Sequence, residues 1–409
     1  MGHERFCAAA ALWRYYRRKA HDCLRRCGDS QVCGWASAVS GPLCVERCIL
    51  NGWYQQPFVA LGKAVLHALG HRQPERCLSE LREFGSNPGN LGGRFYVPQR
   101  GHRMPLVVVL HGCKQTAQAY DRGAAWSQMG DELGFAVLLP EQRRINNGNL
   151  CFNWFRPDDS RRDAGEALSI RQMIVAMLAH HALDSARIYI TGLSAGGAMA
   201  CAMLASYPDV FAGGAIIAGL PFGCANTLQQ AMMRMRGYGG PDDRTLSAMV
   251  HEASGHPGPW PIVSVWQGSA DATVNPSNAD AIMAQWAPLH SVDLTSGTVE
   301  AVDGYPCWRW RDSDGRVVME AYAITGMGHG TPLATQGTHG CGEAGPFMLE
   351  VAISSTRHIC RFWGLAGAGT EAAMAKREGH GPHPPFLVGL FHHLSRFVEG
   401  TLRATGLVR

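Results

Sequence analysis

The sequence has no long hydrophobic run and little net charge. No apolar stretch approaches the roughly 18 residues that a membrane-spanning helix needs, so we expect a soluble globular protein. A net charge of +4 over 409 residues is too small to indicate a nucleic-acid partner. The chain also has no internal repeat, so it is not a repeat array.

The N-terminus lacks the order of features that marks a secretory signal peptide. Such a signal carries its positive charge before its apolar stretch, whereas here the apolar residues 6–13 precede the basic residues of 17–19. The sequence therefore predicts no signal peptide. Its 14 cysteines favour the opposite interpretation, an oxidising and therefore extracellular setting. The compartment, cytoplasmic or extracellular, stays open at this point, and so does the oligomeric state.

Composition divides the chain into three parts. Residues 1–85 hold seven of the 14 cysteines and are expected to form a mainly helical extension. The pairs Cys23/Cys27 and Cys44/Cys48 would each share one helix face. Small buried side chains explain these pairs best, with disulfides or a bound metal as alternatives. Residues 86–365 are expected to form the main domain, and residues 366–409 a linker and an amphipathic helix. The two terminal parts are candidates for docking a partner.

The main domain alternates short apolar runs with longer helical segments. This alternation predicts an α/β fold with a mostly parallel sheet and helices on both faces. Residues 221–258, rich in Met, Gly and Pro, are expected to form a cap or lid. The expected strands are 94–98, 106–110, 135–140, 187–191, 214–218, 262–266 and 318–324, and the expected helices are 117–133, 164–181 and 196–207.

Residues 187–197 place a serine between a strand and a helix. Ser194 is flanked by Gly192 and Gly196, and a sharp strand-to-helix turn needs neighbours without side chains. With 49 glycines in the chain, the pattern Gly-x-Ser-x-Gly alone is weak, and an ordinary glycine turn is the alternative. The strand before it and the helix after it favour a nucleophilic serine.

A serine nucleophile needs a base and an acid that orients the base. In sheets of this kind both partners follow later strands, in the order serine, acid, histidine. Asp271 comes directly after an apolar strand and a glycine, and His329 lies in a glycine-rich loop after another strand. A turn or helix-capping role is the alternative for Asp271. Less favoured residues are Asp280, Asp293 and Asp303 for the acid, and His339 and then His358 for the base.

Ester chemistry also needs two N–H groups that stabilise an oxyanion. We expect one from Ala195, the residue after the serine, and the other from Cys113, in the loop after the early strand 106–110. The alternative for the second is that His111 and Gly112 only end that strand with a turn.

Five short motifs resemble the poly(3-hydroxybutyrate) depolymerase family of esterases, which includes feruloyl and acetylxylan esterases. They are residues 111–115 (HGCKQ), 151–155 (CFNWF), 192–197 (GLSAGG), 268–271 (GSAD) and 326–330 (GMGHG). The resemblance implies an α/β-hydrolase fold and hydrolysis of carboxylic esters through an acyl-enzyme. It implies the triad Ser194, Asp271 and His329, and it makes Cys113 and Cys151 candidates for a disulfide.

The expected substrate is a poly- or oligo(3-hydroxybutyrate) or a related short-chain hydroxyalkanoate ester. A feruloyl or acetylxylan ester is the alternative, and a non-catalytic binding protein on a hydrolase fold is the alternative of another class. No metal or cofactor is needed for this chemistry. Trp154, Trp266 and Trp308 are candidates for the substrate pocket, although large aromatic residues in a sheet protein more often belong to the core.

Overall fold

A computed structural model describes residues 77–99 and 103–366. The expectations for the paired cysteines near the N-terminus and for the terminal amphipathic helix lie outside these ranges. Within them, no helix has both the length and the apolar character that crossing a membrane would require.

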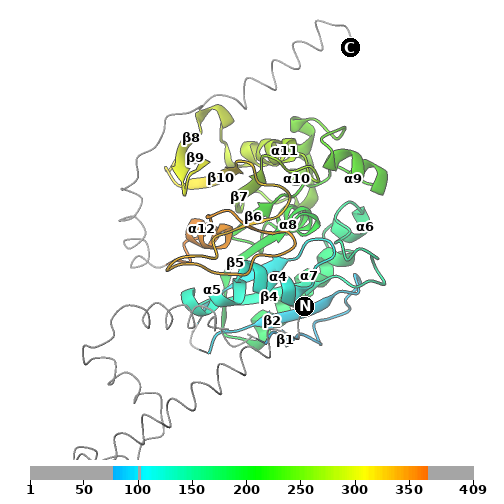
Figure 1. Cartoon of the computed structure of the whole chain (residues 1–409). Coiled ribbons are helices and arrows are strands. Elements are labelled where there is room, and N and C mark those ends of the chain that lie inside the picture. Colours follow the sequence, from blue (N-terminus) through cyan, green and yellow to red (C-terminus); the bar gives the residue numbers. More distant parts are fainter. Residues whose placement is uncertain (1–76, 100–102, 367–409) are drawn as a thin grey trace, which may run out of the picture. The chain divides into compact units, whose positions relative to one another are not determined.

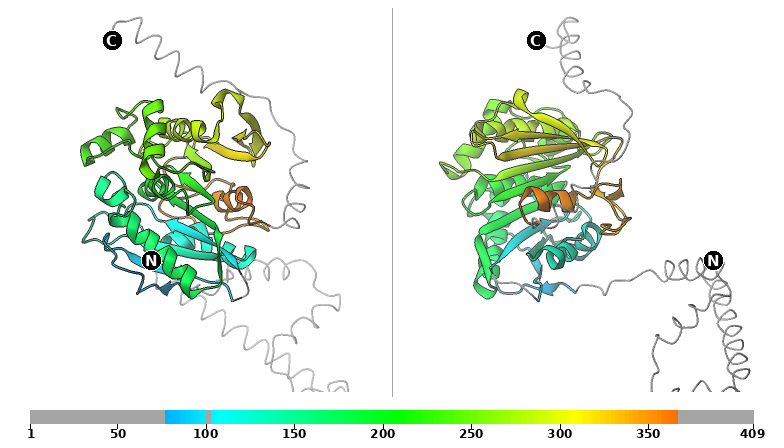
Figure 2. Two further views of the ribbon diagram at one scale, coloured as in Figure 1. Left: turned by 180° about the vertical axis from the view of Figure 1, so that it is seen from behind. Right: turned by 90° about the vertical axis from the view of Figure 1, so that its left-hand side faces the viewer.

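One large sheet organises the described chain (Figure 1). Its strands follow the order β1-β2-β4-β3-β5-β6-β7-β10-β9-β8. Their bounds are β1 (Ser79–Glu80), β2 (Gly92–Tyr96), β3 (Met104–Leu110), β4 (Ala136–Glu141), β5 (Leu183–Leu193), β6 (Gly213–Ile217), β7 (Ile262–Gly268), β8 (Thr298–Val302), β9 (Tyr305–Arg311) and β10 (Val317–Ile324). The strands from β4 to β10 in this order are parallel, whereas β1, β2, β9 and β8 pair antiparallel at the two edges. Figure 2 shows this run from the blue β1–β2 edge to the yellow β8–β10 edge.

Helices cover both faces of the sheet, as predicted. The helices are α4 (Ala117–Ala124), α5 (Trp126–Leu133), α6 (Pro157–Ser160), α7 (Gly165–His180), α8 (Ala195–Ser206), α9 (Leu228–Met235), α10 (Asp243–Ser254), α11 (Ser277–Trp286) and α12 (Ser355–Phe362), with short 3-10 turns at Ala287–His290 and Leu294–Ser296. A separate pair of short strands, β11 (Thr331–Leu333) and β12 (Met348–Glu350), lies between β10 and α12 in the chain.

Alternate residues of the central strand β3 face the two halves of the core. Leu106, Val108 and Leu110 pack with apolar residues of α7, α8, α10 and α11. Val107 and Val109 pack with α4, α5 and α12 on the opposite face. A strand buried on both faces has a continuous apolar sequence, and for this reason the strand 106–110 could be predicted.

Four features differ from the prediction or were absent from it. The expected helix 117–133 is two helices, because Ala125 adopts a left-handed conformation with φ 63°. Residues 221–258 contain α9 and α10. The antiparallel strands β8 and β9 were not predicted, because β8 is largely exposed and β9 mixes charged and aromatic side chains. Ser79 and Glu80, which precede the expected main domain, pair with β2.

Candidate active site

Ser194 occupies the sharp turn between β5 and α8. Its backbone has φ 57° and ψ −118°, a conformation that non-glycine residues rarely adopt. The turn is held by a hydrogen bond of 2.9 Å from the Ser194 N–H to the carbonyl of Ile217 on β6. The strained turn places the serine at the carboxyl edge of the parallel strands, where open α/β sheets bind their ligands.

The two flanking glycines are required by close backbone contacts. A Cβ at Gly192 would lie 2.4 Å from the backbone of Gly196, and one at Gly196 would lie 2.4 Å from the carbonyl oxygen of Leu110. Real Cβ atoms do not approach backbone so closely. The expectation that this turn needs neighbours without side chains is confirmed.

Asp271 and His329 form a short hydrogen bond. The distance from His329 Nδ1 to Asp271 Oδ2 is 2.7 Å, and the two side chains are 8% and 0% exposed. The other carboxylate oxygen, Oδ1, accepts hydrogen bonds of 2.8 Å from the backbone N–H groups of Thr273 and Val274. Gln267 donates to Oδ2 at 3.1 Å. The carboxylate therefore has four hydrogen-bond donors around it.

These donors keep Asp271 ionised. Burial raises the pKa of Asp271, but the His329 side chain and the backbone N–H groups of Val274 and Thr273 outweigh it, and the pKa lies below its usual value. An ionised carboxylate only accepts hydrogen bonds, so His329 carries its proton on Nδ1. The second ring nitrogen, Nε2, is then free to accept a proton, as a general base requires.

The loop that carries His329 is fixed against the loop that carries Asp271. The Ala270 N–H donates to the carbonyl of Met327 at 3.0 Å, and the Gly326 N–H donates to Ser269 Oγ at 2.9 Å. A Cβ at Gly268 would lie 2.4 Å from the Met327 carbonyl oxygen. The glycine therefore allows the two loops to touch.

The strand order brings this pair to the edge that carries Ser194. β5, β6, β7 and β10 are neighbours and run parallel, so the loops after them emerge together. Among the hydrogen bonds of residues 77–99 and 103–366, none joins Ser194 Oγ to His329. Catalytic hydrogen bonds are often long in the absence of substrate and tighten when it binds.

The two expected oxyanion donors lie on neighbouring elements. The start of α8 approaches the end of β3 so closely that Gly196 touches the carbonyls of Leu110 and His111. Within the described ranges, the N–H groups of Ala195 and Cys113 donate to no backbone acceptor. Cys113 is joined to Cys151 by a disulfide, which confirms the pairing implied by the motifs.

The less favoured histidines occupy other environments. His339 is exposed, and its backbone carbonyl accepts a hydrogen bond from Arg357. His358 donates or accepts through Nε2 at 2.8 Å from Asp303, which gives a second histidine–aspartate pair. The Nδ1 atom of His358, however, is buried without a partner, and its ring lies beside the rings of Trp266 and Tyr322.

The remaining acidic candidates have structural positions. Asp280 lies in the first turn of α11. Asp293 caps the short 3-10 turn that follows, through a hydrogen bond of 2.8 Å from the Thr295 N–H to its carboxylate.

The three tryptophans differ in their surroundings. Trp266 is fully buried in β7, stacks on Tyr322 at 3.7 Å and donates to Ser264 Oγ, so it belongs to the core. Trp308 lies in the middle of the antiparallel strand β9. Trp154 lies in the loop that follows the carboxyl end of β4, but it is 8% exposed and packs in the core, with its ring edge to face against that of Phe155.

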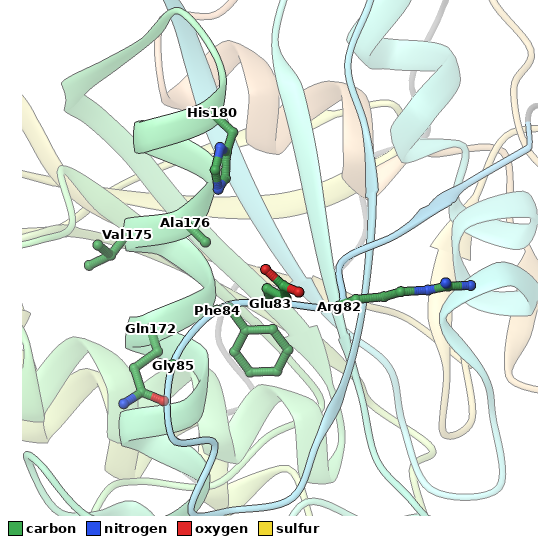
Figure 3. A pocket seen from close by; sticks show the side chains of 8 residues that line it. All are labelled: Arg82, Glu83, Phe84, Gly85, Gln172, Val175, Ala176 and His180. Atoms are coloured by element: carbon green, nitrogen blue, oxygen red, sulfur yellow. The ribbon is translucent and has the colours of Figure 1, made fainter.

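A cleft lies between α7 and the segment that precedes β2 (Figure 3). Its lining includes an acid and an imidazole, Glu83 and His180, but no hydroxyl or thiol side chain. It therefore lacks a nucleophile and is separate from the candidate active site.

Behind the expected oxyanion donors lies a buried carboxyl group that the sequence did not indicate. Glu166, on α7, accepts hydrogen bonds from the side chain of Gln142 at 2.6 Å and from the backbone and side chain of Asn153 at 2.9 and 2.8 Å. Burial raises the pKa of Glu166 to about 8, against the effect of these donors. Gln142 also donates to the carbonyl of Cys151, so this network supports the disulfide.

Two further residues around the candidate triad were missed. Gln267 holds Asp271, and the ring of Phe347 meets that of His329 edge to face, with centroids 6.0 Å apart. No spacing rule identifies them. Gln267 is a single polar residue at the end of an apolar strand, and Phe347 lies outside the glycine-rich motif that contains His329.

Comparison with known proteins gives a consistent picture. The family model described as "Esterase PHB depolymerase" matches residues 94–305. Poly(3-hydroxyalkanoate) depolymerase C of Paucimonas lemoignei is 44% identical over 298 residues, which cover 71% of each chain. Probable acetylxylan esterase A of Aspergillus clavatus is 31% identical and covers 63% of this chain and 84% of the relative. Acetyl xylan esterase from Aspergillus awamori superposes with a TM-score of 0.59 at 23% identity, over 71% of this chain and all of that one. The structural likeness confirms the expected α/β-hydrolase fold.

The contacts at the serine turn predict the effect of a single methyl group. We expect Gly196→Ala to lower the melting temperature by several degrees or to prevent folding, because the new Cβ would collide with backbone on β3. Gly148→Ala is the matched control, since nothing lies within 4 Å of a Cβ there. Thermal unfolding followed by circular dichroism measures both. Equal melting temperatures for the two variants would contradict the tight turn.

The buried Glu166 predicts a pH dependence of stability. A folded-state pKa of about 8, against an ordinary value of 4.5, means that the folded protein binds this proton more tightly than the unfolded chain does. The resulting stabilisation is fully present below pH 4.5 and is lost as the pH rises through 8. It amounts to a few kcal/mol, on the order of 1.4 kcal/mol per pKa unit.

Urea unfolding between pH 5 and 9 measures this slope, and Glu166→Gln should flatten it. Some slope should remain, because burial also raises the pKa of Glu320 to about 7. Glu252→Gln, at an exposed position of α10, is the control and should leave the slope unchanged. A slope in Glu166→Gln equal to that of the unaltered protein would rule out the assignment to this residue.

Proposed function

This chain belongs to the esterase PHB depolymerase family, and from that premise we propose that it hydrolyses hydroxyalkanoate esters with Ser194, Asp271 and His329 as its catalytic triad. The chain is a serine carboxylic ester hydrolase. The observation that carries the residue assignment is the 2.7 Å hydrogen bond between His329 and Asp271, in loops that emerge beside the Ser194 turn.

The proposed reaction follows from the protonation states of these groups. His329 Nε2 takes the proton of Ser194 Oγ as that oxygen attacks the ester carbonyl carbon. The imidazolium that forms is stabilised by the ionised Asp271. The N–H groups of Ala195 and Cys113 donate to the oxyanion, which lowers the barrier by about 3 kcal/mol for each donor. His329 then returns the proton to the leaving alcohol, and water releases the acid by the same steps in reverse.

The exposed side chains near this edge support an aliphatic polyester or its oligomers as substrate. Ile145 follows β4, Leu228 and Met232 follow β6, and Phe347 lies beside His329; all four are large, apolar and exposed. Exposed apolar side chains suit contact with alkyl groups between ester carbonyls better than contact with the hydroxyl groups of a polysaccharide. The name of the relative from Paucimonas lemoignei, a poly(3-hydroxyalkanoate) depolymerase, agrees with this proposal.

A feruloyl or acetylxylan ester is the second candidate substrate. It is supported by the probable acetylxylan esterase of Aspergillus clavatus and by feruloyl esterase B of Thermothelomyces thermophilus, which is 31% identical over 62% of this chain and 88% of its own. For either substrate, the Cys113–Cys151 disulfide supports an extracellular, oxidising setting.

A panel of esters separates the candidate substrates. We expect release of 3-hydroxybutyrate from soluble oligomers, followed by liquid chromatography, to exceed release of ferulate from methyl ferulate or acetate from acetylated xylan. Ser194→Ala should abolish all three activities and the hydrolysis of p-nitrophenyl butyrate, because the attacking oxygen is missing, with a loss on the order of 10⁴-fold or more.

Two outcomes would count against the proposal in different ways. Faster release of ferulate or acetate would assign the chain to the second substrate class and leave the triad intact. Retained turnover in Ser194→Ala would contradict the assignment of the triad. Absence of labelling by a fluorophosphonate probe would favour a non-catalytic binding protein.

A further inference from the structure

An exposed phenylalanine lies beside the histidine of the proposed triad. Phe347 is 38% exposed, and its ring meets that of His329 at an interplanar angle of 77°, with centroids 6.0 Å apart. The next residue, Met348, is 5% exposed and packs against α4, where a Cβ at Gly123 would lie 2.7 Å from its Cγ. The chain therefore buries the methionine and leaves the aromatic ring partly open to water.

The backbone that carries this ring adopts an unfavourable conformation. Phe347 has φ 62°, in the left-handed region that bulky residues rarely occupy. The turn around it is closed by hydrogen bonds of 3.0 and 2.9 Å between the backbones of Gly345 and Met348. An exposed aromatic ring and a left-handed backbone both destabilise the folded state. Such costs concentrate at sites where they serve function, which directs attention to what the ring can contact.

The turn is fixed to the loops on two sides of the candidate site. The Phe347 carbonyl accepts a hydrogen bond of 2.8 Å from the N–H of Thr331, in β11 directly after the histidine loop. The Pro346 carbonyl accepts one of 3.5 Å from the side chain of Gln115, whose Oε1 accepts from the Gly112 N–H at 2.9 Å. Gly112 and Gln115 belong to the loop after β3, which carries an expected oxyanion donor. The ring is thus held between the loop of the base and the loop of the oxyanion donor.

The proposed reaction determines which part of an ester meets this ring. His329 takes the proton of the serine and returns it to the leaving alcohol, so the alcohol oxygen must come within reach of the imidazole. The carbonyl oxygen, in contrast, is directed at the backbone N–H groups. A side chain in contact with His329 therefore adjoins the alcohol part of the ester rather than its acyl part.

We propose that Phe347 is a specificity-determining residue, which contacts the alcohol part of the ester and favours alcohols that carry alkyl groups over sugar alcohols. In a polyhydroxyalkanoate this alcohol is the hydroxyl end of the next monomer, with its alkyl group, whereas in a xylan ester it is a sugar with free hydroxyl groups. Contact with the ring removes apolar surface of an alkyl group from water, but it would deprive sugar hydroxyls of hydrogen bonds. The inference rests on the proposed function and adds a residue that selects the leaving alcohol.

Three variants separate the ring from the backbone that carries it. Phe347→Gly removes the ring and relieves the left-handed backbone, because glycine adopts positive φ without strain. We therefore expect this variant to fold, with a melting temperature within a few degrees of the unaltered protein. Phe347→Tyr keeps an aromatic ring and is the conservative variant. Ser291→Gly is the matched control, since Ser291 is another exposed residue with a left-handed backbone, φ 56°, at the end of the 3-10 turn Ala287–His290.

The measurement is kcat/KM for three esters of butyric acid, followed by acid release at constant pH. Butyl butyrate, glycerol monobutyrate and the monobutyrate of methyl xyloside form the same acyl-enzyme, so they differ only in the step that expels the alcohol. For Phe347→Gly we expect kcat/KM to fall about tenfold with butyl butyrate, at the lower end of what one apolar contact contributes to specificity. With the two polar alcohols it should stay within about threefold. The ratio of kcat/KM for p-nitrophenyl acetate and p-nitrophenyl butyrate, which differ only in the acyl group, should stay within about twofold.

The pattern across esters decides between selection and general support of the site. Phe347→Tyr and Ser291→Gly should keep the preference of the unaltered protein for butyl butyrate within about twofold. The inference is overturned if Phe347→Gly keeps that preference, or if it loses activity equally with all three esters, which would mean that the ring only orients His329. A larger loss with the xyloside ester would also overturn it and would assign the ring to stacking on a sugar. An unaltered protein that hydrolyses none of the esters would instead contradict the proposed function.

Discussion

The hydrogen bond between Asp271 and His329 is the interaction on which the proposed chemistry depends. Removing a carboxylate from water is costly unless donors surround it, and here Gln267, Thr273 and Val274 supply them together with His329. Because the carboxylate stays ionised, it determines the tautomer of the imidazole. That tautomer leaves Nε2 unprotonated, as an attack by serine requires. With fewer hydrogen-bond donors around it, Asp271 would be less strongly held in its ionised form and would not fix the tautomer of His329.

Close backbone contact between segments brings the candidate catalytic residues together. It occurs twice, at Gly196 against β3 and at Gly268 against the loop of His329. In both places a glycine removes the side chain that would hold the segments apart. Behind the first contact, the disulfide and the network around Glu166 restrain the loops that follow β3 and β4. Rigid loops reduce the reorganisation needed when the oxyanion forms.

Much of this arrangement follows from local sequence, and the rest depends on contacts between distant segments. The buried parallel strands, and the positions of Ser194, Asp271 and His329 directly after such strands, could be predicted, because an apolar run followed by glycine and a polar residue is a short-range signal. The role of Gln267 could not, since only the folded loop brings its amide to Asp271. Burial of Trp266 against Tyr322 likewise depends on the pairing of β7 with β10, which no local pattern specifies.

The most direct test of the central claim is a crystal structure of the protein after inactivation by an alkyl fluorophosphonate, which mimics the tetrahedral intermediate. The account predicts phosphorus bonded to Ser194 Oγ, with His329 Nε2 within hydrogen-bonding distance of that oxygen. It also predicts the phosphoryl oxygen about 2.7–3.1 Å from the backbone nitrogens of both Cys113 and Ala195. Phosphorus on another residue, or a phosphoryl oxygen directed away from these two N–H groups, would contradict it.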